Sequence, residues 1–296
     1  RMLQDVPPPV VAPAALPEIV VTAARLPPAA ADAAFSVVRI DQAVLSRSAR
    51  IDEALRSVPA VSLFRRTTSL AANPTTQGLS LRAIAPSGAG RTLVLLDGAP
   101  LNDPFGGWVI WSQAAPESLE GVDVVRGAGS GPYGAGALTG AITLRERSQG
   151  GVLDVSAAER GGMRAAGSAS ARLGPVAVTL SGVRDVSDGY VPVRGPAAGA
   201  ADTPLDLDSR AAAVRIDGAL GRTNLSMRAA TWEEDRGSGL AGTRANASGH
   251  SLSAAVAQAP SADGYGWRLQ AWRIDSDLAN SSASVSADRA TTTPAN

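Results

Sequence analysis

The pattern of hydrophobic and polar residues changes near residue 150 and divides the chain into two regions. In the first region the pattern is mixed: residues 37–40 predict a strand, and residues 52–58 predict a short amphipathic helix that ends before Pro59. After Gly150 the chain is rich in Gly, Ala, Ser and Arg and alternates with a period of two. We therefore expect an α+β domain followed by an all-β region.

Two strands of the first region are predicted to form a hairpin. Residues 78–84 and 92–97 both have strand character, and the turn-rich segment 85–90 joins them. In such a hairpin, the segments 69–76 and 101–111 emerge together at the end opposite the turn. They would then share one binding surface.

The second region predicts roughly seven strands, separated by turns and longer loops. They lie at residues 153–159, 163–173, 176–181, 214–219, 224–233, 251–258 and 265–274. One face of each strand is apolar and the other polar, which fits both a soluble sandwich and a membrane barrel. The aromatic residues favour the membrane barrel, because they lie at or near predicted strands, where interfacial girdles form: Tyr190, Trp232, Tyr265, Trp267 and Trp272.

Composition removes several classes of function. The chain has 296 residues, a net charge of 0 and 45% hydrophobic residues, so it can fold, and it gives no electrostatic footprint for nucleic acid. All of its basic residues are Arg and it has no Cys, so neither a Walker lysine nor a thiolate metal site is available. His250 is the only histidine and is expected in a loop, and the acids of segment 233–235 are expected in a solvated loop. No cofactor and no metal site are predicted.

The first 28 residues have the composition of an extended tether, because seven of them are Pro. Within this tether, segment 18–23 reads Glu-Ile-Val-Val-Thr-Ala and is β-prone. By itself it is either a linker or a strand that adds to a sheet edge of another protein.

Three motifs follow one another between residues 95 and 140. They are Leu-Leu-Asp-Gly at 95–98, Val-Asp-Val-Val-Arg-Gly at 122–127, and Ser-Gly-Pro-Tyr-Gly at 130–134 with Ala137 and Gly140. This ordered set resembles the plug domain of TonB-dependent outer-membrane receptors. Asp123 stands where that family usually has Glu, and Thr-Leu-Arg-Glu at 143–146 replaces its usual ending.

The resemblance implies an α+β plug domain followed by antiparallel transmembrane β-barrel strands. Residues 1–28 would be a periplasmic segment, 29–149 the plug, and 150–296 the N-terminal part of the barrel. Plugged transporters use about 22 strands, so the barrel is expected to be incomplete in this chain. The implied function is import of a scarce small molecule across the outer membrane rather than catalysis. Iron–siderophore complexes and cobalamin rank first, because they are common ligands of this family, and oligosaccharides are also possible.

The resemblance also implies roles for particular residues. The periplasmic domain of TonB would capture the box formed by Glu18, Ile19, Val20, Val21, Thr22 and Ala23. Plug arginines pair with wall carboxylates in the family, and the matching positions are Arg82 and Arg126. Apical plug loops touch the ligand, which nominates Asn102, Asp103, Phe105, Trp108 and Trp111 first, and Asn73 and Thr75 second.

Two alternatives use the same residues differently. A passive outer-membrane barrel or adhesin would carry segment 18–23 as an inert linker. The spacing Gly129-x-Gly131-x-x-Gly134 superficially matches a dinucleotide fingerprint. However, Pro132 and the following glycines do not predict the helix that such a site requires.

Overall fold

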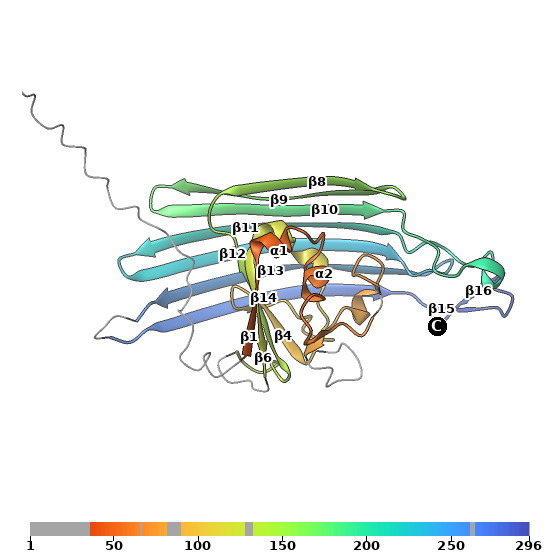
Figure 1. Ribbon diagram of the computed structural model, residues 1–296, viewed down its shortest axis with the longest axis horizontal. Coiled ribbons are helices and arrows are strands. Elements are labelled where there is room, and N and C mark those ends of the chain that lie inside the picture. The colour runs from red at the N-terminus through yellow and green to blue at the C-terminus, as the bar shows by residue number, and fades with distance from the viewer. Residues whose placement is uncertain (1–35, 66, 82–89, 128–132, 261–263, 296) are drawn as a thin grey trace, which may run out of the picture.

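The computed structural model describes residues 36–65, 67–81, 90–127, 133–260 and 264–295. A sheet of long strands runs along the long axis of the molecule, and a smaller N-terminal domain lies beside it (Figure 1). We call the sheet the wall and the N-terminal domain the plug.

The plug is built on a five-stranded sheet with the order β1-β6-β7-β4-β5. The strands of this sheet are β1 (Ser36–Asp41), β4 (Thr92–Leu96), β5 (Ala99–Pro100), β6 (Leu119–Arg126) and β7 (Gly140–Glu146). The plug also contains a two-stranded sheet of β2 (Val61–Ser62) and β3 (Ser80–Leu81). Its helical segments are α1 (Gln42–Leu45), α2 (Ile51–Leu55), η2 (Pro74–Thr76), η3 (Trp111–Gln113) and η4 (Pro116–Ser118). Buried apolar residues of α1, α2, β4, β6 and β7 form one core.

The strand predicted at residues 37–40 is confirmed as β1, and the predicted helix is shorter than expected. Helix α2 ends at Leu55, and the chain continues as a turn in which Ser57 and Val58 donate to carbonyls three residues earlier. This tighter last turn before Pro59 satisfies carbonyls that a helix end leaves free.

The predicted hairpin of residues 78–84 with 92–97 is wrong. Strand β3 pairs antiparallel with β2, whereas β4 pairs in parallel with β7 and antiparallel with β5. Strand β4 is buried along most of its length, and such a strand is stable in the middle of a sheet, where both edges are paired. Strand β4 therefore has one partner that is close in sequence, β5, and one that is distant, β7.

The wall confirms the seven predicted strands. It is an antiparallel sheet in sequence order, made of β8 (Gly151–Ala158), β9 (Gly162–Leu173), β10 (Val176–Ser187), β11 (Leu207–Leu220), β12 (Thr223–Gly237), β13 (Arg244–Gln258) and β14 (Trp267–Asn280). In the part of the chain that the structure describes, β8 and β14 are its edges, so the barrel is not closed. A short hairpin of β15 (Ala283–Val285) and β16 (Thr292–Pro294) follows β14, and η5 (Gly195–Ala197) lies between β10 and β11.

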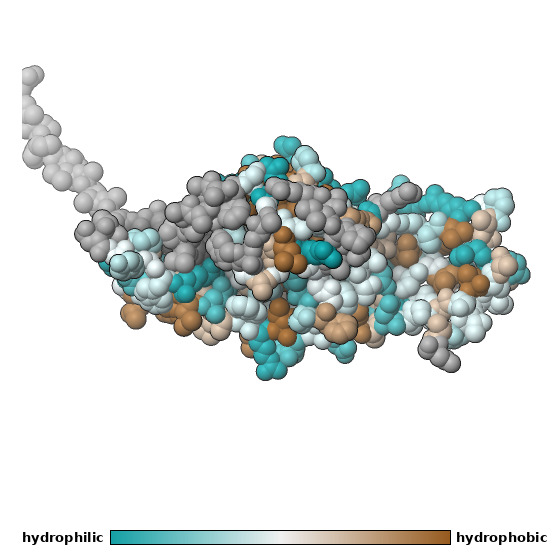
Figure 2. Space-filling view, turned by 90° about the horizontal axis from the view of Figure 1, so that it is seen from below, coloured by the Kyte–Doolittle hydropathy of each residue, from teal (hydrophilic) through white to brown (hydrophobic). Residues whose placement is uncertain are grey.

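The wall has its polarity reversed relative to a water-soluble protein. Its buried side chains include many polar and charged ones: Arg164, Ser168, Thr179, Asp185, Ser209, Arg215, Asp217, Glu234 and Arg236. Its exposed side chains include large apolar ones: Leu153, Val155, Met163, Leu173, Leu180, Ile216, Leu220, Met227, Leu252 and Leu269. Apolar surface is visible along the lower margin of the molecule in Figure 2. A soluble sandwich buries its apolar face, whereas this sheet exposes it. The sheet is therefore part of a membrane barrel and not of a soluble sandwich.

Three expectations about side chains of the wall are wrong. Trp232 does not belong to an outward girdle: it is 4% exposed and packs inward with Ile110 of the plug. His250 lies on β13, not in a loop, and residues 233–235 lie on β12. Each acid of that segment is paired with an arginine on the sheet, which satisfies charges that sequence alone assigned to solvent. No helix among the described residues is both long and apolar enough to span a membrane.

Candidate functional site

The centre of the contact between plug and wall is a cluster of charged side chains around Arg215 of β11. Its Nη1 lies 2.8 Å from Asp97 Oδ2 and 3.5 Å from Glu146 Oε2, and its Nε lies 2.8 Å from Asp217 Oδ2. Arg228 of β12 adds a 3.0 Å contact from Nε to Glu146 Oε1. Asp97 and Glu146 belong to the plug, so two wall arginines hold two plug carboxylates in a buried setting.

The Leu-Leu-Asp-Gly motif places Asp97 in this cluster. Asp97 and Gly98 both have positive φ, 46° and 90°, and form the turn between β4 and β5. The carbonyl of Asp97 accepts hydrogen bonds from Arg268 Nη2 at 2.7 Å and from Gln270 Nε2 at 3.3 Å, both on β14. The φ of Gly98 favours glycine, and a Cβ there would lie 2.5 Å from Arg268 Nη2, so the ends of the Arg268 and Gln270 side chains would have to shift.

A second group of ion pairs lies at the other edge of the contact. Arg164 of β9 holds Glu117 of η4 with two hydrogen bonds, of 2.9 and 2.7 Å. In the opposite sense, Arg50 of the plug reaches Asp185 of β10 at 2.8 Å. Bidentate, charge-assisted pairs of this kind fix the register of two surfaces as well as their separation.

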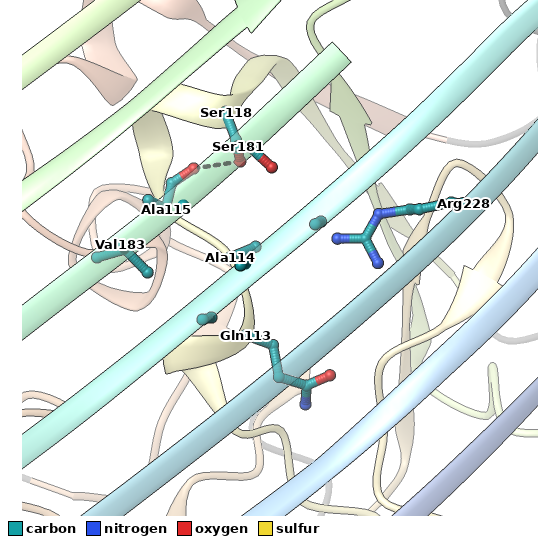
Figure 3. Close-up of a pocket in the computed structure, with 11 residues that line it drawn as sticks. Gln113, Ala114, Ala115, Ser118, Ser181, Val183 and Arg228 are labelled. Carbon is teal, nitrogen blue, oxygen red and sulfur yellow. Dashed lines mark hydrogen bonds between the residues drawn. The ribbon is translucent and has the colours of Figure 1, made fainter. Parts of the chain in front are cut away.

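Small side chains of the wall let the plug approach closely between these ion pairs. Segment 113–118 of the plug faces positions 181–183 of β10 and 211–213 of β11, which are mostly Ala, Ser and Gly (Figure 3). The space left between them is about 10 Å³, room for about one water molecule. Within the segment, Ser118 Oγ donates to the carbonyl of Ala115 at 2.7 Å.

The predicted latch arginines stay a prediction. Arg126 lies on β6 and donates a hydrogen bond to Ser36 Oγ on β1, and Arg82 lies outside the described residues. The ion pairs described above have mostly the reverse sense, with arginines on the wall and carboxylates on the plug. Period-two alternation places Arg215 on the polar face of β11, but it does not identify which plug residue Arg215 meets.

The first nominated ligand loop is held at its base and open at its tip. Asn102 is structural: its side chain accepts from Val94 N at 2.8 Å and donates to the carbonyls of Thr92 and Gly107. Asp103 accepts from Phe105 N and Gly106 N through one oxygen, and from Ser276 Oγ of β14 at 2.9 Å through the other. The turn that Asp103 caps therefore presents Phe105, which is 96% exposed.

The two tryptophans of this loop have different surroundings. Trp108 is half-buried and packs on the cluster of Ile110, Trp232 and Ala247 that joins plug to wall. Trp111 is 3% exposed, and its Nε1 donates to the carbonyl of Gln77 at 3.1 Å. This burial corrects the expectation that Trp111 offers its side chain to a ligand.

The second nominated segment borders a cavity at one end of the wall. Asn73 donates to Asn280 Oδ1 at 3.1 Å, and its own Oδ1 accepts from Thr75 N and Oγ1. Asn280 and Ser276 both lie on β14, so the two nominated segments contact the same wall strand even though the predicted hairpin does not exist. The cavity has a volume of about 320 Å³ and is lined by Thr67, Ala71, Ala72, Asn73, Thr76, Leu205, Gly237 and Ser238.

Segment 18–23 and residues 129–132 of the glycine spacing lie outside the described residues. Within the described part of the chain, the structure shows no group of three or more His, Cys, Asp or Glu side chains arranged to hold a metal ion.

Comparison with protein families matches residues 29–141 to the TonB-dependent Receptor Plug Domain. That range covers β1 to the start of β7, including Asp97 and Glu117 of the ionic contacts. No curated protein matches the chain.

Solved structures with the same fold include import receptors and a transporter. The ferric-catecholate import receptor Fiu from E. coli matches with a TM-score of 0.62 at 15% identity, over 86% of this chain and 39% of that chain. A mutant of the ferric enterobactin receptor PfeA from Pseudomonas aeruginosa, in complex with enterobactin, matches at 0.63 and 14%, over 87% and 44%. The copper transporter OprC matches at 0.65 and 16%, over 83% and 38%.

The chain thus spans about two fifths of the length of these structures. At such identities the matches show the fold, and the fold includes both the plug and the wall. Together with the plug-domain match and the reversed polarity of the wall, they show a TonB-dependent receptor plug domain followed by an unclosed set of antiparallel barrel strands, in the fold of these receptors.

Proposed function

We propose that the chain is part of a receptor that imports a scarce small molecule across the outer membrane by TonB-driven movement of the plug. The observation that carries this proposal is the seating of the plug on the polar face of the wall by buried ion pairs such as Arg215–Asp97 and Arg164–Glu117. A plug held in this way obstructs free diffusion through the lumen. Passage of a ligand then requires work on the plug, which an energised partner supplies.

The orientation follows from the lengths of the connections. Strands β9 and β10, and likewise β11 and β12, are joined by two-residue turns at one end of the wall, which also has the eight-residue connection 259–266. The longest connection, residues 188–206, lies at the other end together with residues 238–243. Barrels of this class have short periplasmic turns and longer extracellular loops. We therefore place the long-loop end outside the cell and the N-terminal segment in the periplasm, with lipid against the apolar outer face.

The ligand-facing surface then lies at the outer end. Strand β14 ends at the same edge as β10, so Ser276 and Asn280 mark the long-loop end, and both contact nominated plug segments. The cavity of about 320 Å³ beside Asn73 lies within the usual size of small-molecule sites. We propose that Asn73, Thr75, Asp103, Phe105 and Trp108 contact the ligand.

The structural relatives favour an iron–siderophore complex among the possible ligands. Fiu is a ferric-catecholate import receptor and PfeA a ferric enterobactin receptor, while OprC transports copper. An iron chelate therefore ranks first for this chain, with cobalamin next.

Coupling to TonB is assigned to Glu18, Ile19, Val20, Val21, Thr22 and Ala23. A β-prone run between prolines can add as a strand to a sheet edge, and its Pro-rich flanking sequence would give it reach towards its partner. Strand addition depends on backbone N–H groups, which proline lacks.

The test compares Val20→Pro, inside this segment, with Val11→Pro in the preceding tether. We expect the native peptide 17–27 to bind the periplasmic domain of TonB and the Val20→Pro peptide not to bind. In cells, uptake of a ferric siderophore should be lost with Val20→Pro and retained with Val11→Pro. Undiminished uptake in the Val20→Pro receptor would instead support a passive barrel or adhesin.

A further inference from the structure

A buried ion pair on β12 contacts both ligand-facing segments of the plug. Arg236 and Glu234 are two residues apart on the same strand, so their side chains project from the same face. Arg236 Nη2 lies 2.9 Å from Glu234 Oε1, and Nε lies 3.1 Å from the same oxygen. The side chains are 2% and 0% exposed, so solvent does not compensate either charge.

Arg236 holds the first segment through its backbone. Its Nη1 donates to the carbonyls of Ser69 at 2.8 Å, Leu70 at 3.3 Å and Ala72 at 2.7 Å. These residues directly precede Asn73, which lines the cavity at the outer end. The guanidinium therefore fixes the curve of the chain that leads into the proposed ligand contact.

Glu234 holds the second segment. Its Oε2 accepts a hydrogen bond of 2.8 Å from Ser112 Oγ, one residue after Trp111. Ser112 follows directly on the segment 101–111 that contains Asp103, Phe105 and Trp108. One carboxylate oxygen thus contacts Arg236, and the other contacts the plug.

We infer that the Glu234–Arg236 pair is a positioning element that couples the two ligand-facing segments of the plug. The inference rests on the proposed function for the identity of those segments. Moving either segment away leaves a buried charge with unsatisfied hydrogen-bonding groups, which is costly. The segments therefore move together with the pair, so that a ligand contact at one of them shifts the other.

Two interactions inside the plug strengthen this coupling from the first segment. Asp52 of α2 accepts from Ser69 N at 3.0 Å and from Ser69 Oγ at 2.6 Å. Ser69 is therefore held from the plug core on one side and from the wall on the other, and a displacement at residues 69–72 acts on helix α2 as well.

The test is amide hydrogen exchange of the receptor in detergent micelles, without ligand and without TonB. Ser112→Ala removes one hydroxyl next to the second segment. We expect exchange to become about tenfold faster at Ala71 and Thr76 in the first segment, as well as at Gln113 beside the substitution. Arg236→Gln should have the converse effect, with faster exchange at Gln113 and Gly107.

Arg228→Gln is the matched control, because it removes another wall arginine, 9% exposed, whose plug partner, Glu146, lies outside both segments. It should leave exchange in both segments unchanged. Changes confined to the segment next to each substitution would overturn the coupling, and Ser112→Ala decides this even if Arg236→Gln does not fold. The exchange experiment contains neither ligand nor TonB, so it tests the coupling of the two segments independently of transport. Undiminished uptake by the Val20→Pro receptor would contradict the proposed function, whereas unchanged exchange in the segment away from each substitution would contradict the coupling.

Discussion

Arg215 of the wall and Asp97 of the plug form a buried ion pair, with Nη1 2.8 Å from Oδ2 and the arginine side chain 2% exposed. The two residues are 118 positions apart in the sequence. Their contact joins strand β11 to the turn between β4 and β5, so it sets how the plug sits in the wall. Its removal tests whether the plug is seated by charge.

We expect Arg215→Gln to weaken plug seating by about 3–5 kcal/mol, because it removes the cation beside the buried carboxylate of Asp217 and the partly buried carboxylate of Asp97. Urea unfolding in detergent micelles, with proteolysis of the plug as the readout, measures this change. Arg210→Gln is the control, since its pair with Glu233 is exposed and should be worth about 0–1 kcal/mol. Equal effects of the two substitutions would refute a special role for Arg215.

Gly98 offers a test of the turn that presents Asp97. Gly98→Ala introduces a methyl group 2.5 Å from Arg268 Nη2 and imposes a side chain on a φ of 90°. Gly134→Ala has a similar φ cost, with φ at 96°, but its methyl group meets no atom within 4 Å. We expect Gly98→Ala to lower the free energy of unfolding by about 1 kcal/mol more than Gly134→Ala, because the methyl group displaces Arg268 and Gln270 from their hydrogen bonds to the carbonyl of Asp97. If thermal unfolding gives equal losses, the close approach of β14 to this turn is not required.

The connections at the long-loop end of the wall contain an ion pair that responds to acid. Arg289 donates to Asp202 through Nε at 3.0 and 2.9 Å, and this bond lowers the pKa of Asp202 from 3.8 to about 2. The carbonyl of Arg289 also accepts from Ala201 N at 2.9 Å. A lowered pKa in the folded state means that the pair's contribution to loop stability is complete above about pH 4 and is lost as the pH falls towards 2.

Cleavage of loop 188–206 by pepsin checks this expectation when the native receptor is compared with Asp202→Asn. At pH 4 the native loop should be cut several-fold more slowly than the variant, and the two rates should converge near pH 2. The ratio of the two rates removes the pH dependence of pepsin itself. A constant ratio across this range would show that the ion pair does not hold the loop.

Local features of the fold were predictable from the sequence, because period-two alternation is a property of each strand alone. All seven wall strands follow from it. Pairing across the plug was not predictable, since the parallel neighbour of β4 is β7, at a distance of about fifty residues. The sequence also does not determine whether the apolar face of the wall is buried or exposed, because the alternation is the same in a sandwich and in a barrel.

The candidate site was predictable as motifs but not as contacts. The Asp-Gly turn at 97–98 is visible in the sequence, whereas Arg215 and Arg268, which approach it, come from strands far along the chain. Trp111 illustrates the same limit. An aromatic residue beside a glycine-rich loop suggests ligand contact, but the carbonyl of Gln77 and the plug core bury it.

The outer face of the wall gives the last prediction. Met227 lies on this face beside Ile216 and Ala254, in a band of apolar side chains, while Thr231 lies on the same face of β12 beside His250. His250 contacts Asp275 at 3.1 Å, so the surroundings of Thr231 are polar.

If lipid covers the apolar band, Met227→Arg should make folding into lipid vesicles less favourable by about 2–4 kcal/mol. Thr231→Arg should change it by about 0–1 kcal/mol, because this position lies towards the aqueous interface. Equal losses of folding free energy at the two positions would place the membrane boundary elsewhere on β12. No loss at either position would show that lipid does not contact the outer face.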